Sequence, residues 1–219
     1  MVDIAIFDID GTLVDTNYQH SVAWFRAFRR FDLTIPVWRI HRSIGMGGDQ
    51  LVTEVAGDRV EKEHGDALRD AWTDEYGPML KEVQPFAGAR ELLTDVRDRG
   101  FTVVLASSGQ QEQVDHYLDL LDARSVAAAW TTSSDVEQTK PSPDLLQAAM
   151  AKVDGDSAVM LGDATWDCVA AAKAGIASYA VRSGGFSAEE LRTAGARKVF
   201  ESLEELREQL DDTLLGRAG

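Results

Sequence analysis

The chain has 219 residues, enough to bury a full hydrophobic core as one large domain or as a core with an insertion. Its formal net charge of −15 repels phosphate backbones and anionic headgroups, so we expect neither nucleic acids nor membrane surfaces as partners. The single cysteine, Cys168, excludes an intrachain disulfide, and no apolar run approaches a membrane span, so we expect a cytoplasmic protein.

The first predicted strand, residues 4–7, leads directly into two carboxylates. Its sequence Ile-Ala-Ile-Phe is short, apolar and β-prone, which indicates a buried strand. Side chains alternate along a strand, so Asp8 and Asp10 project from one face, and Gly11 allows the turn that follows. Their mutual repulsion is costly unless a cation neutralises it or one acid is protonated. The pair therefore predicts a hard metal ion such as Mg²⁺ or separate acid and base roles.

A helical region interrupts the α/β pattern after this strand. We expect helices over residues 18–31, 48–56 and 59–76 and no strand among them. An all-helical insert between the first two strands of a sheet indicates a cap. The predicted organisation is a core of residues 1–15 and 85–219 with a helical cap domain of residues 16–84.

Short apolar segments alternate with helical patterns in the rest of the chain. The predicted strands are residues 101–106, 126–130, 158–161, 176–181 and 198–200. Predicted helices cover residues 89–99 and 167–174, and others begin after the cap residue Ser142 and at a capping box over residues 187–190. Strands that alternate with helices imply right-handed crossovers, so we predict an α/β fold with a parallel sheet covered on both faces.

Two of the later segments carry groups that can bind an anion. Ser107 and Ser108 follow a predicted strand, and a hydroxyl with backbone amides beyond it can bind a phosphate oxygen. Lys140 directly precedes a Pro-Ser-Pro-Asp helix start, where it can place a positive charge beside an anion and a carboxylate. A solvated surface lysine is the alternative interpretation of this second motif.

Two further acids follow the predicted strand at residues 158–161. Asp163 can complete the oxygen ligands of a divalent cation held by Asp8 and Asp10. Asp167 opens the next helix, so either it caps that helix or it contacts the metal from the second shell or through water. The sequence leaves both roles of Asp167 open.

In this order, the four motifs resemble those of the haloacid dehalogenase-like superfamily of aspartyl-phosphate hydrolases. The helical insert resembles the C1 cap of the branch that holds phosphoglycolate phosphatases and β-phosphoglucomutase-like phosphatases. The resemblance covers the whole chain and implies a Rossmann-like core. It also implies that Asp8 is the nucleophile and a metal ligand, that Asp10 is the general acid and base and a ligand through its backbone carbonyl, and that Asp163 binds Mg²⁺. Ser107 and Lys140 would hold the phosphoryl group.

The acid at position 10 favours phosphoryl transfer, because the dehalogenases that name the superfamily need no leaving-group protonation. The leading hypothesis is a Mg²⁺-dependent phosphatase acting on a small phosphorylated metabolite of the phosphoglycolate or sugar-phosphate type. A β-phosphoglucomutase-like phosphomutase is one alternative, although Trp72 stands near the place of that enzyme's cap lysine. A non-catalytic binding protein on this fold is the other.

Three residues of the insert are candidate contacts to the site or its hinge. Thr16 and His20 lie in a stretch similar to the mutase's entry into its cap, and His20 either sits above the site or packs within the cap. Arg42 opens a Gly-rich stretch that is either a specificity loop, with Arg42 contacting a second phosphate or a carboxylate, or a simple connection. We expect Trp38 and Trp72 in the cap core, and a monomer, with a dimer as the alternative.

Overall fold

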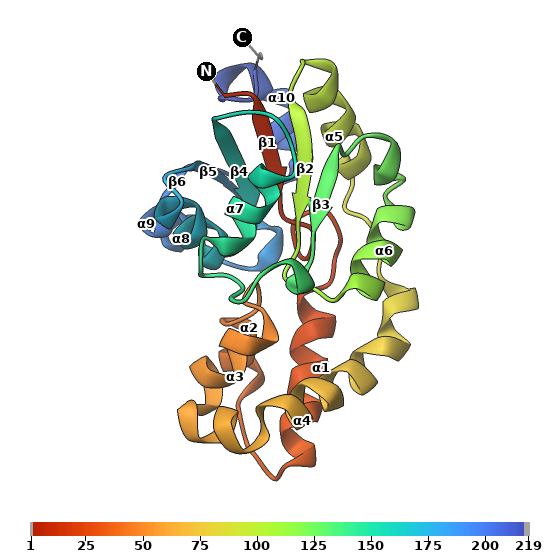
Figure 1. Cartoon of the computed structure of the whole chain (residues 1–219), viewed down its shortest axis with the longest axis vertical. Coiled ribbons are helices and arrows are strands. Elements are labelled where there is room, and N and C mark those ends of the chain that lie inside the picture. The colour runs from red at the N-terminus through yellow and green to blue at the C-terminus, as the bar shows by residue number, and fades with distance from the viewer. Residues whose placement is uncertain (1, 217–219) are drawn as a thin grey trace.

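Six parallel strands form one sheet in the part of the chain that the computed structural model describes, residues 2–216. In chain order they are β1 (Ile4–Phe7), β2 (Thr102–Ala106), β3 (Ala129–Thr131), β4 (Ala158–Gly162), β5 (Ala177–Val181) and β6 (Ala196–Phe200). The predicted α/β fold is confirmed (Figure 1). β3 begins later than predicted, because Val126 and Ala127 pack into the core from a turn rather than from the strand.

The carboxyl ends of three strands meet at one edge of this sheet. The strand order is β3-β2-β1-β4-β5-β6, which places β1 between β2 and β4. Phe7 is in register with Leu105 and Leu161, so the polar residues that follow the three strands lie close together. The strand order reverses at β1, and open α/β sheets bind ligands at such a point.

Helices cover both faces of the sheet, as the alternation of the strand side chains requires. They are α5 (Ala89–Asp98), α6 (Gln111–Leu120), α7 (Asp144–Ala151), α8 (Thr165–Lys173), α9 (Ala188–Ala194) and α10 (Leu203–Glu208). Ala5 and Phe7 face the core layer built with α5, α6 and α10, whereas Ile4 and Ile6 face the layer built with α7 and α8. α6 and α10 are absent from the sequence prediction.

The insert between β1 and β2 consists of helices and the loops that join them, and it adds no strand to the sheet in the described residues. It holds α1 (Asn17–Arg30), α2 (Val37–His41), α3 (Gly48–Ala56), α4 (Asp58–Tyr76) and a 3₁₀ segment (Gly77–Glu82). Trp24, Phe28 and Leu68 belong to a hydrophobic cluster that is separate from the two layers of the sheet. Figure 1 shows these helices beyond the carboxyl edge of the sheet, where they cover the ends of the strands.

One expectation for the insert is wrong. Trp38 was expected in the cap core, but its exposed fraction is 70%. It lies on the short helix α2, which the sequence did not predict and which buries only Ile40. Trp72, by contrast, is buried within the cluster of the insert.

The helix starts test two of the predicted caps. At α9 the capping box is confirmed, since Ser187 Oγ accepts from Glu190 N at 3.2 Å and Glu190 Oε2 accepts from Ser187 N at 2.9 Å. At α7 the prediction is wrong: Pro143 occupies the cap position, and Ser142 Oγ donates to Asp144 Oδ1 at 2.7 Å. The Ser142 hydroxyl therefore donates to a carboxylate and does not accept from a backbone N–H of the helix start.

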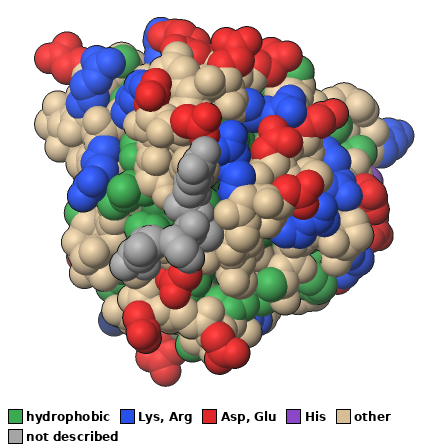
Figure 2. All heavy atoms as spheres, turned by 90° about the horizontal axis from the view of Figure 1, so that it is seen from above, with side chains coloured by type: hydrophobic (Ala, Val, Ile, Leu, Met, Phe, Trp, Pro, Cys, Tyr) green, Lys and Arg blue, Asp and Glu red, His purple; other side chains and the backbone are tan. Residues whose placement is uncertain are grey.

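The surface carries both signs of charge. Figure 2 shows the end of the molecule opposite the insert, where acidic and basic side chains are interspersed. None of the described helices is long and apolar enough to cross a membrane.

The separate hydrophobic cluster of the insert should contribute directly to stability. Leu68→Ala removes a fully buried side chain from α4 and should lower the free energy of unfolding by about 2–5 kcal/mol. Lys62→Ala, an exposed change on the same helix, should shift it by less than about 0.5 kcal/mol. Urea denaturation of both variants measures this, and equal effects would contradict the assignment of Leu68 to a packed core.

Candidate active site

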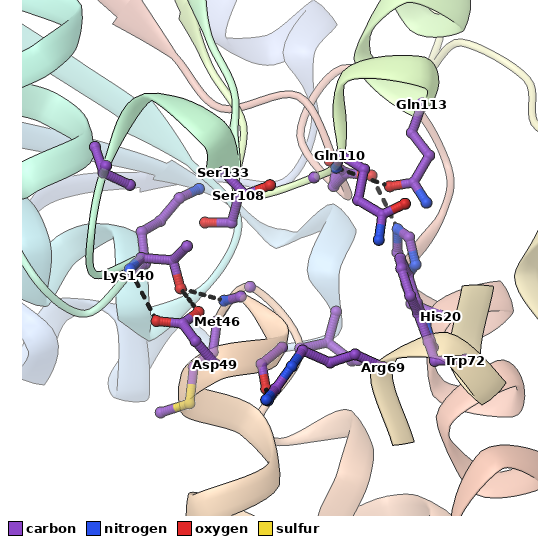
Figure 3. Close-up of a pocket in the computed structure, with 18 of the residues that line it drawn as sticks. His20, Met46, Asp49, Arg69, Trp72, Ser108, Gln110, Gln113, Ser133 and Lys140 are labelled. Carbon is purple, nitrogen blue, oxygen red and sulfur yellow. Dashed lines mark hydrogen bonds and ion pairs between the residues drawn. The ribbon is translucent and has the colours of Figure 1, made fainter. Parts of the chain in front are cut away.

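A cavity of about 230 Å³ lies between the carboxyl edge of the sheet and the insert. Asp8, Asp10 and Lys140 line it from the sheet side, and His20 and Trp72 line it from the insert. Figure 3 shows Lys140 and Ser108 on one wall and Arg69 and Trp72 on the other. The pocket thus brings together residues that are far apart in the sequence.

Lys140 is buried between two carboxylates. Its exposed fraction is 1%, its ammonium pairs with Asp8, and Nζ donates to Asp167 Oδ1 at 2.8 Å. Burial would lower the pKa of Lys140, but the charges of Asp167 and Asp8 outweigh it and raise the pKa above its ordinary value. The surface-lysine alternative is therefore excluded, and the ammonium is held charged beside Asp8.

Three buried carboxylates share this corner of the site. Ligand oxygens of Asp8, Asp163 and Asp167 all lie within 4.8 Å of one another. Burial is the largest cause that raises the pKa of Asp8, with Lys140 opposing it and the neighbouring acids adding to it. Burial and Asp167 likewise raise the pKa of Asp163 to about 7. One lysine cannot neutralise three carboxylates, and this oxygen-rich donor set fits a hard divalent cation.

Asp163 is also oriented by two hydrogen bonds from the segment after β1. Thr12 Oγ1 donates to its Oδ1 and Asn17 Nδ2 donates to its Oδ2, both at 2.8 Å. Asn17 Oδ1 is buried and has no partner within residues 2–216. The sequence analysis missed Asn17, because nothing in the sequence links it to a residue on β4's exit.

Asp167 performs the capping role and a second one. Its Oδ2 accepts from Ala164 N at 3.0 Å at the start of α8, while its Oδ1 accepts from Lys140. A Cβ at position 162 would overlap the Asp167 side chain, so only glycine allows this close approach. Asp167 therefore caps the helix and fixes the lysine with the same carboxylate.

Asp10 lies in a different environment from Asp8. Its Oδ2 accepts from Ser107 Oγ at 2.9 Å, and its Oδ1 contacts His20 Nε2 at 2.9 Å and accepts from Thr16 Oγ1 at 3.3 Å. An ionised carboxylate can only accept, so Nε2 carries the proton in this pair. Burial opposes ionisation of Asp10, but the hydrogen bond and charge of His20, with Ser107 and Lys140, lower its pKa.

Aromatic side chains hold His20 against Asp10. The His20 ring stacks on Tyr76 with centroids 4.1 Å apart and on Trp72 at 5.5 Å. The Tyr76 hydroxyl pairs with that of Tyr117, and burial raises the pKa of both phenols above the ordinary value. His20 therefore fills both of the roles that the sequence left open: it packs within the insert and it also faces the site.

The two serines after β2 make different contacts. The Ser107 hydroxyl donates to Asp10 and accepts from Gly109 N at 2.9 Å. Ser108 lines the cavity, and its buried hydroxyl has no partner among the described residues. Ser108, and not Ser107, therefore has a hydroxyl free to donate to an oxygen atom of a bound molecule.

Arg42 lies outside the lining of the cavity. Its guanidinium pairs with Glu190 and sits 4.0 Å from the centroid of Phe186, and its carbonyl accepts from Trp166 Nε1 at 3.1 Å. Its partners are on the core side of the chain, so Arg42 fastens the insert to the core. The Gly-rich stretch after it does reach the cavity, through Met46 among others.

The sequence analysis did not predict a second set of contacts between the insert and the core. Asp49 of α3 accepts from Thr139 N at 3.1 Å and from the Thr139 hydroxyl, which in turn accepts from Gly47 N at 3.0 Å. Because Thr139 immediately precedes Lys140, this clasp ties the insert to the segment that positions the lysine. No short-range pattern could reveal a pair 90 residues apart.

The arrangement supports nucleophilic chemistry on an anionic group. Asp8 offers a carboxylate beside a fixed ammonium, and Ser108 offers an unpaired donor. Asp10 is held separately, within reach of the same cavity, where it can exchange a proton.

Comparisons with known proteins agree with this description. The chain belongs to the haloacid dehalogenase-like hydrolases, whose family model matches residues 5–181. It is 30% identical to a phosphoglycolate phosphatase from Caulobacter vibrioides over 90% of this chain and 85% of that protein. It is 26% identical to a validoxylamine A 7'-phosphate phosphatase from Streptomyces hygroscopicus subsp. limoneus, over 80% and 84%.

The crystal structure of a hydrolase from Pseudomonas syringae has the same fold. It superposes with a TM-score of 0.89 at 31% identity, over 96% of this chain and 98% of that one. The predicted resemblance is confirmed, and the protein is a phosphoric monoester hydrolase of this family. The non-catalytic alternative is thereby set aside.

The raised pKa of Asp163 predicts how Mg²⁺ binding depends on pH. The carboxyl must lose its proton to bind a cation, so affinity should fall as the pH falls below about 7. Isothermal calorimetry across this range, in buffers of different ionisation enthalpy, measures both the affinity and the released proton.

The Asp163→Asn variant is the control for this measurement, because its side chain cannot titrate. It should bind Mg²⁺ weakly and with a smaller dependence on pH near 7. A wild-type affinity that stays constant through this range would contradict the assignment.

Proposed function

We propose that this phosphatase uses Mg²⁺ to hydrolyse a small phosphorylated metabolite through an aspartyl-phosphate on Asp8. The observation that carries the proposal is the separation of the two carboxylates after β1. Asp8 is paired with Lys140 inside the acid cluster, whereas Asp10 is bonded to Ser107 and His20. The two acids therefore have environments suited to different tasks.

Asp8, Asp163 and the backbone carbonyl of Asp10 would hold the metal ion. When bound, Mg²⁺ would offset the repulsion between the carboxylates and a dianionic phosphate and would stabilise charge in the transition state. Lys140 and Ser108 would bind phosphate oxygens, with one charge and one unpaired donor. The acidic surface would not prevent binding of an anion, because Mg²⁺ and Lys140 would supply positive potential inside the site.

The reaction would proceed in two steps. Asp8 attacks phosphorus and forms the aspartyl-phosphate, while the bond to the leaving oxygen breaks and Asp10 gives that oxygen a proton. Asp10 then takes a proton from water, which attacks phosphorus and releases inorganic phosphate and free Asp8. A dianion bound beside Asp10 raises its pKa, which lets the carboxyl carry the proton that the first step requires.

The insert would exclude bulk water during these steps. The clasp between Asp49 and Thr139 and the contacts of Arg42 place the helices over the strand ends. The cavity of about 230 Å³ suits a small substrate, in line with the metabolite phosphates in the names of the relatives. We propose a phosphate monoester of this size as the substrate.

Phosphate release from a panel of monoesters, with and without Mg²⁺, tests the proposal. Asp8→Asn should lower kcat by at least about 10³-fold because the nucleophile is lost. Asp10→Asn should lower it by about 10²–10⁴-fold because proton transfer is lost.

Asp15→Asn is the matched control, since Asp15 is an exposed acid in the same segment and should leave activity unchanged. Full activity in Asp8→Asn, or release that ignores the metal, would contradict the mechanism. Conversion of a hexose bisphosphate without net phosphate release would instead support the mutase alternative.

A further inference from the structure

The cavity lining outside the acid cluster carries an unusual distribution of charge. We call this part of the lining the outer pocket and define it by Trp24, Asp49, Arg69, Trp72 and Glu137, of which Asp49 lies beside Thr139. In Figure 3, Arg69 and Trp72 lie across the cavity from Lys140 and Ser108. A substrate whose phosphate rests beside Lys140 would direct its leaving group toward the outer pocket.

Arg69 is the only cation of the outer pocket, and its terminal N–H groups are already engaged. Nη1 donates to Glu61 Oε2 at 3.0 Å and to Gly48 O at 3.2 Å. Nη2 donates to Glu61 Oε1 at 2.9 Å and to Asp66 Oδ1 at 2.8 Å. Only the Nε–H remains, so Arg69 has no pair of parallel donors left for the two-point contact that binds a carboxylate or phosphate.

The acids of the outer pocket are not neutralised by a cation. Asp49 bonds to Gln50 and Thr139, and neither Asp49 nor Glu137 makes an ion pair within the described residues. Lys140, the other cation that lines the cavity, is committed to Asp8 and Asp167. A second anion on the substrate would therefore face two acids and no free cation.

Uncharged contacts are available in the outer pocket. Trp24 and Trp72 stack with centroids 5.5 Å apart and present aromatic surface to the cavity. The indole N–H of Trp72 is buried without a hydrogen-bond partner among residues 2–216. Aromatic faces attract cations and apolar ring faces, and an unpaired N–H can donate to a hydroxyl.

We propose that the outer pocket selects phosphate monoesters with an uncharged or cationic leaving group and rejects those that bear a carboxylate or a second phosphate. This proposal rests on the phosphatase function proposed above and narrows its substrate class. It separates this protein from the relative named for phosphoglycolate, whose substrate carries a carboxylate. Like charges that line one cavity repel each other, and such repulsion is one way in which a site rejects the wrong partner.

Three two-carbon monoesters that differ only in the terminal group test the proposal directly. They are 2-phosphoglycolate, 2-hydroxyethyl phosphate and phosphoethanolamine, with an anionic, a neutral and a cationic end. We expect kcat/KM for phosphoglycolate to be at least about tenfold below that for the other two. Phosphoglycolate as an equal or better substrate would overturn the proposal.

Measuring the binding of the three esters separates the test of selectivity from the test of hydrolysis. Calorimetric Kd values for the three esters on the Asp8→Asn protein with Mg²⁺ rank them without turnover. The same order is expected there, and tighter binding of phosphoglycolate would overturn the selectivity even if hydrolysis is confirmed. Absence of phosphate release from every monoester would overturn the proposed function instead.

Releasing Arg69 should change the selectivity. Glu61→Gln removes the charge and one of the two acceptor oxygens of its bidentate partner, so the ratio of kcat/KM for phosphoglycolate to that for 2-hydroxyethyl phosphate should rise several-fold. Glu63→Gln makes the same charge change on the same helix, where Glu63 pairs with Arg59, and should leave the ratio unchanged. Equal ratios in the two variants would overturn the role of Arg69.

A second variant covers the case in which Glu61→Gln is unstable. Glu137 is exposed and makes no hydrogen bond in the described structure, so Glu137→Gln should fold normally. It should raise the same ratio several-fold by removing one repulsive charge. An unchanged ratio in a folded Glu137→Gln protein would count against repulsion as the source of selectivity.

Discussion

The structure depends on a concentration of buried negative charge at the end of β1. Asp8, Asp163 and Asp167 lie together with Lys140 as the cation between them. Breaking a buried pair by removing one partner typically costs about 3–5 kcal/mol, so these groups constrain one another strongly. A divalent cation would offset the remaining negative charge and would allow an anionic phosphate group to bind beside Lys140.

The fold places each member of this cluster. Parallel pairing of β1 with β2 and β4 brings the three strand ends to one edge, and the close approach at Gly162 lets Asp167 reach both its helix and Lys140. The insert closes the edge through the clasp at Thr139, which adjoins the lysine. The segment of Thr139 and Lys140 therefore links the position of the insert to the position of the lysine ammonium.

Features governed by local pattern could be predicted from the sequence, and features governed by remote contacts could not. Apolar runs and helix ends predicted the six strands and the residues that follow them, including Asp8 and Asp163. The burial of Lys140 was ambiguous, because it depends on two acids distant in the sequence. Trp38 was misplaced because it lies on α2, a five-residue helix that the sequence did not predict and that buries only Ile40. Arg69 pairs with Glu61 of its own helix and also donates to Gly48 of α3, and the second of these contacts has no local signal in the sequence.

The central claim is that the carboxylates at the end of β1 form a metal site on the nucleophile's side of the cavity. Anomalous diffraction from crystals grown with Mn²⁺ and inorganic phosphate tests it most directly. A peak bridging Asp8, Asp163 and the carbonyl of Asp10, with phosphate beside Lys140, is the predicted result. A cavity without a peak at this position, or a peak held by other residues, would contradict the account.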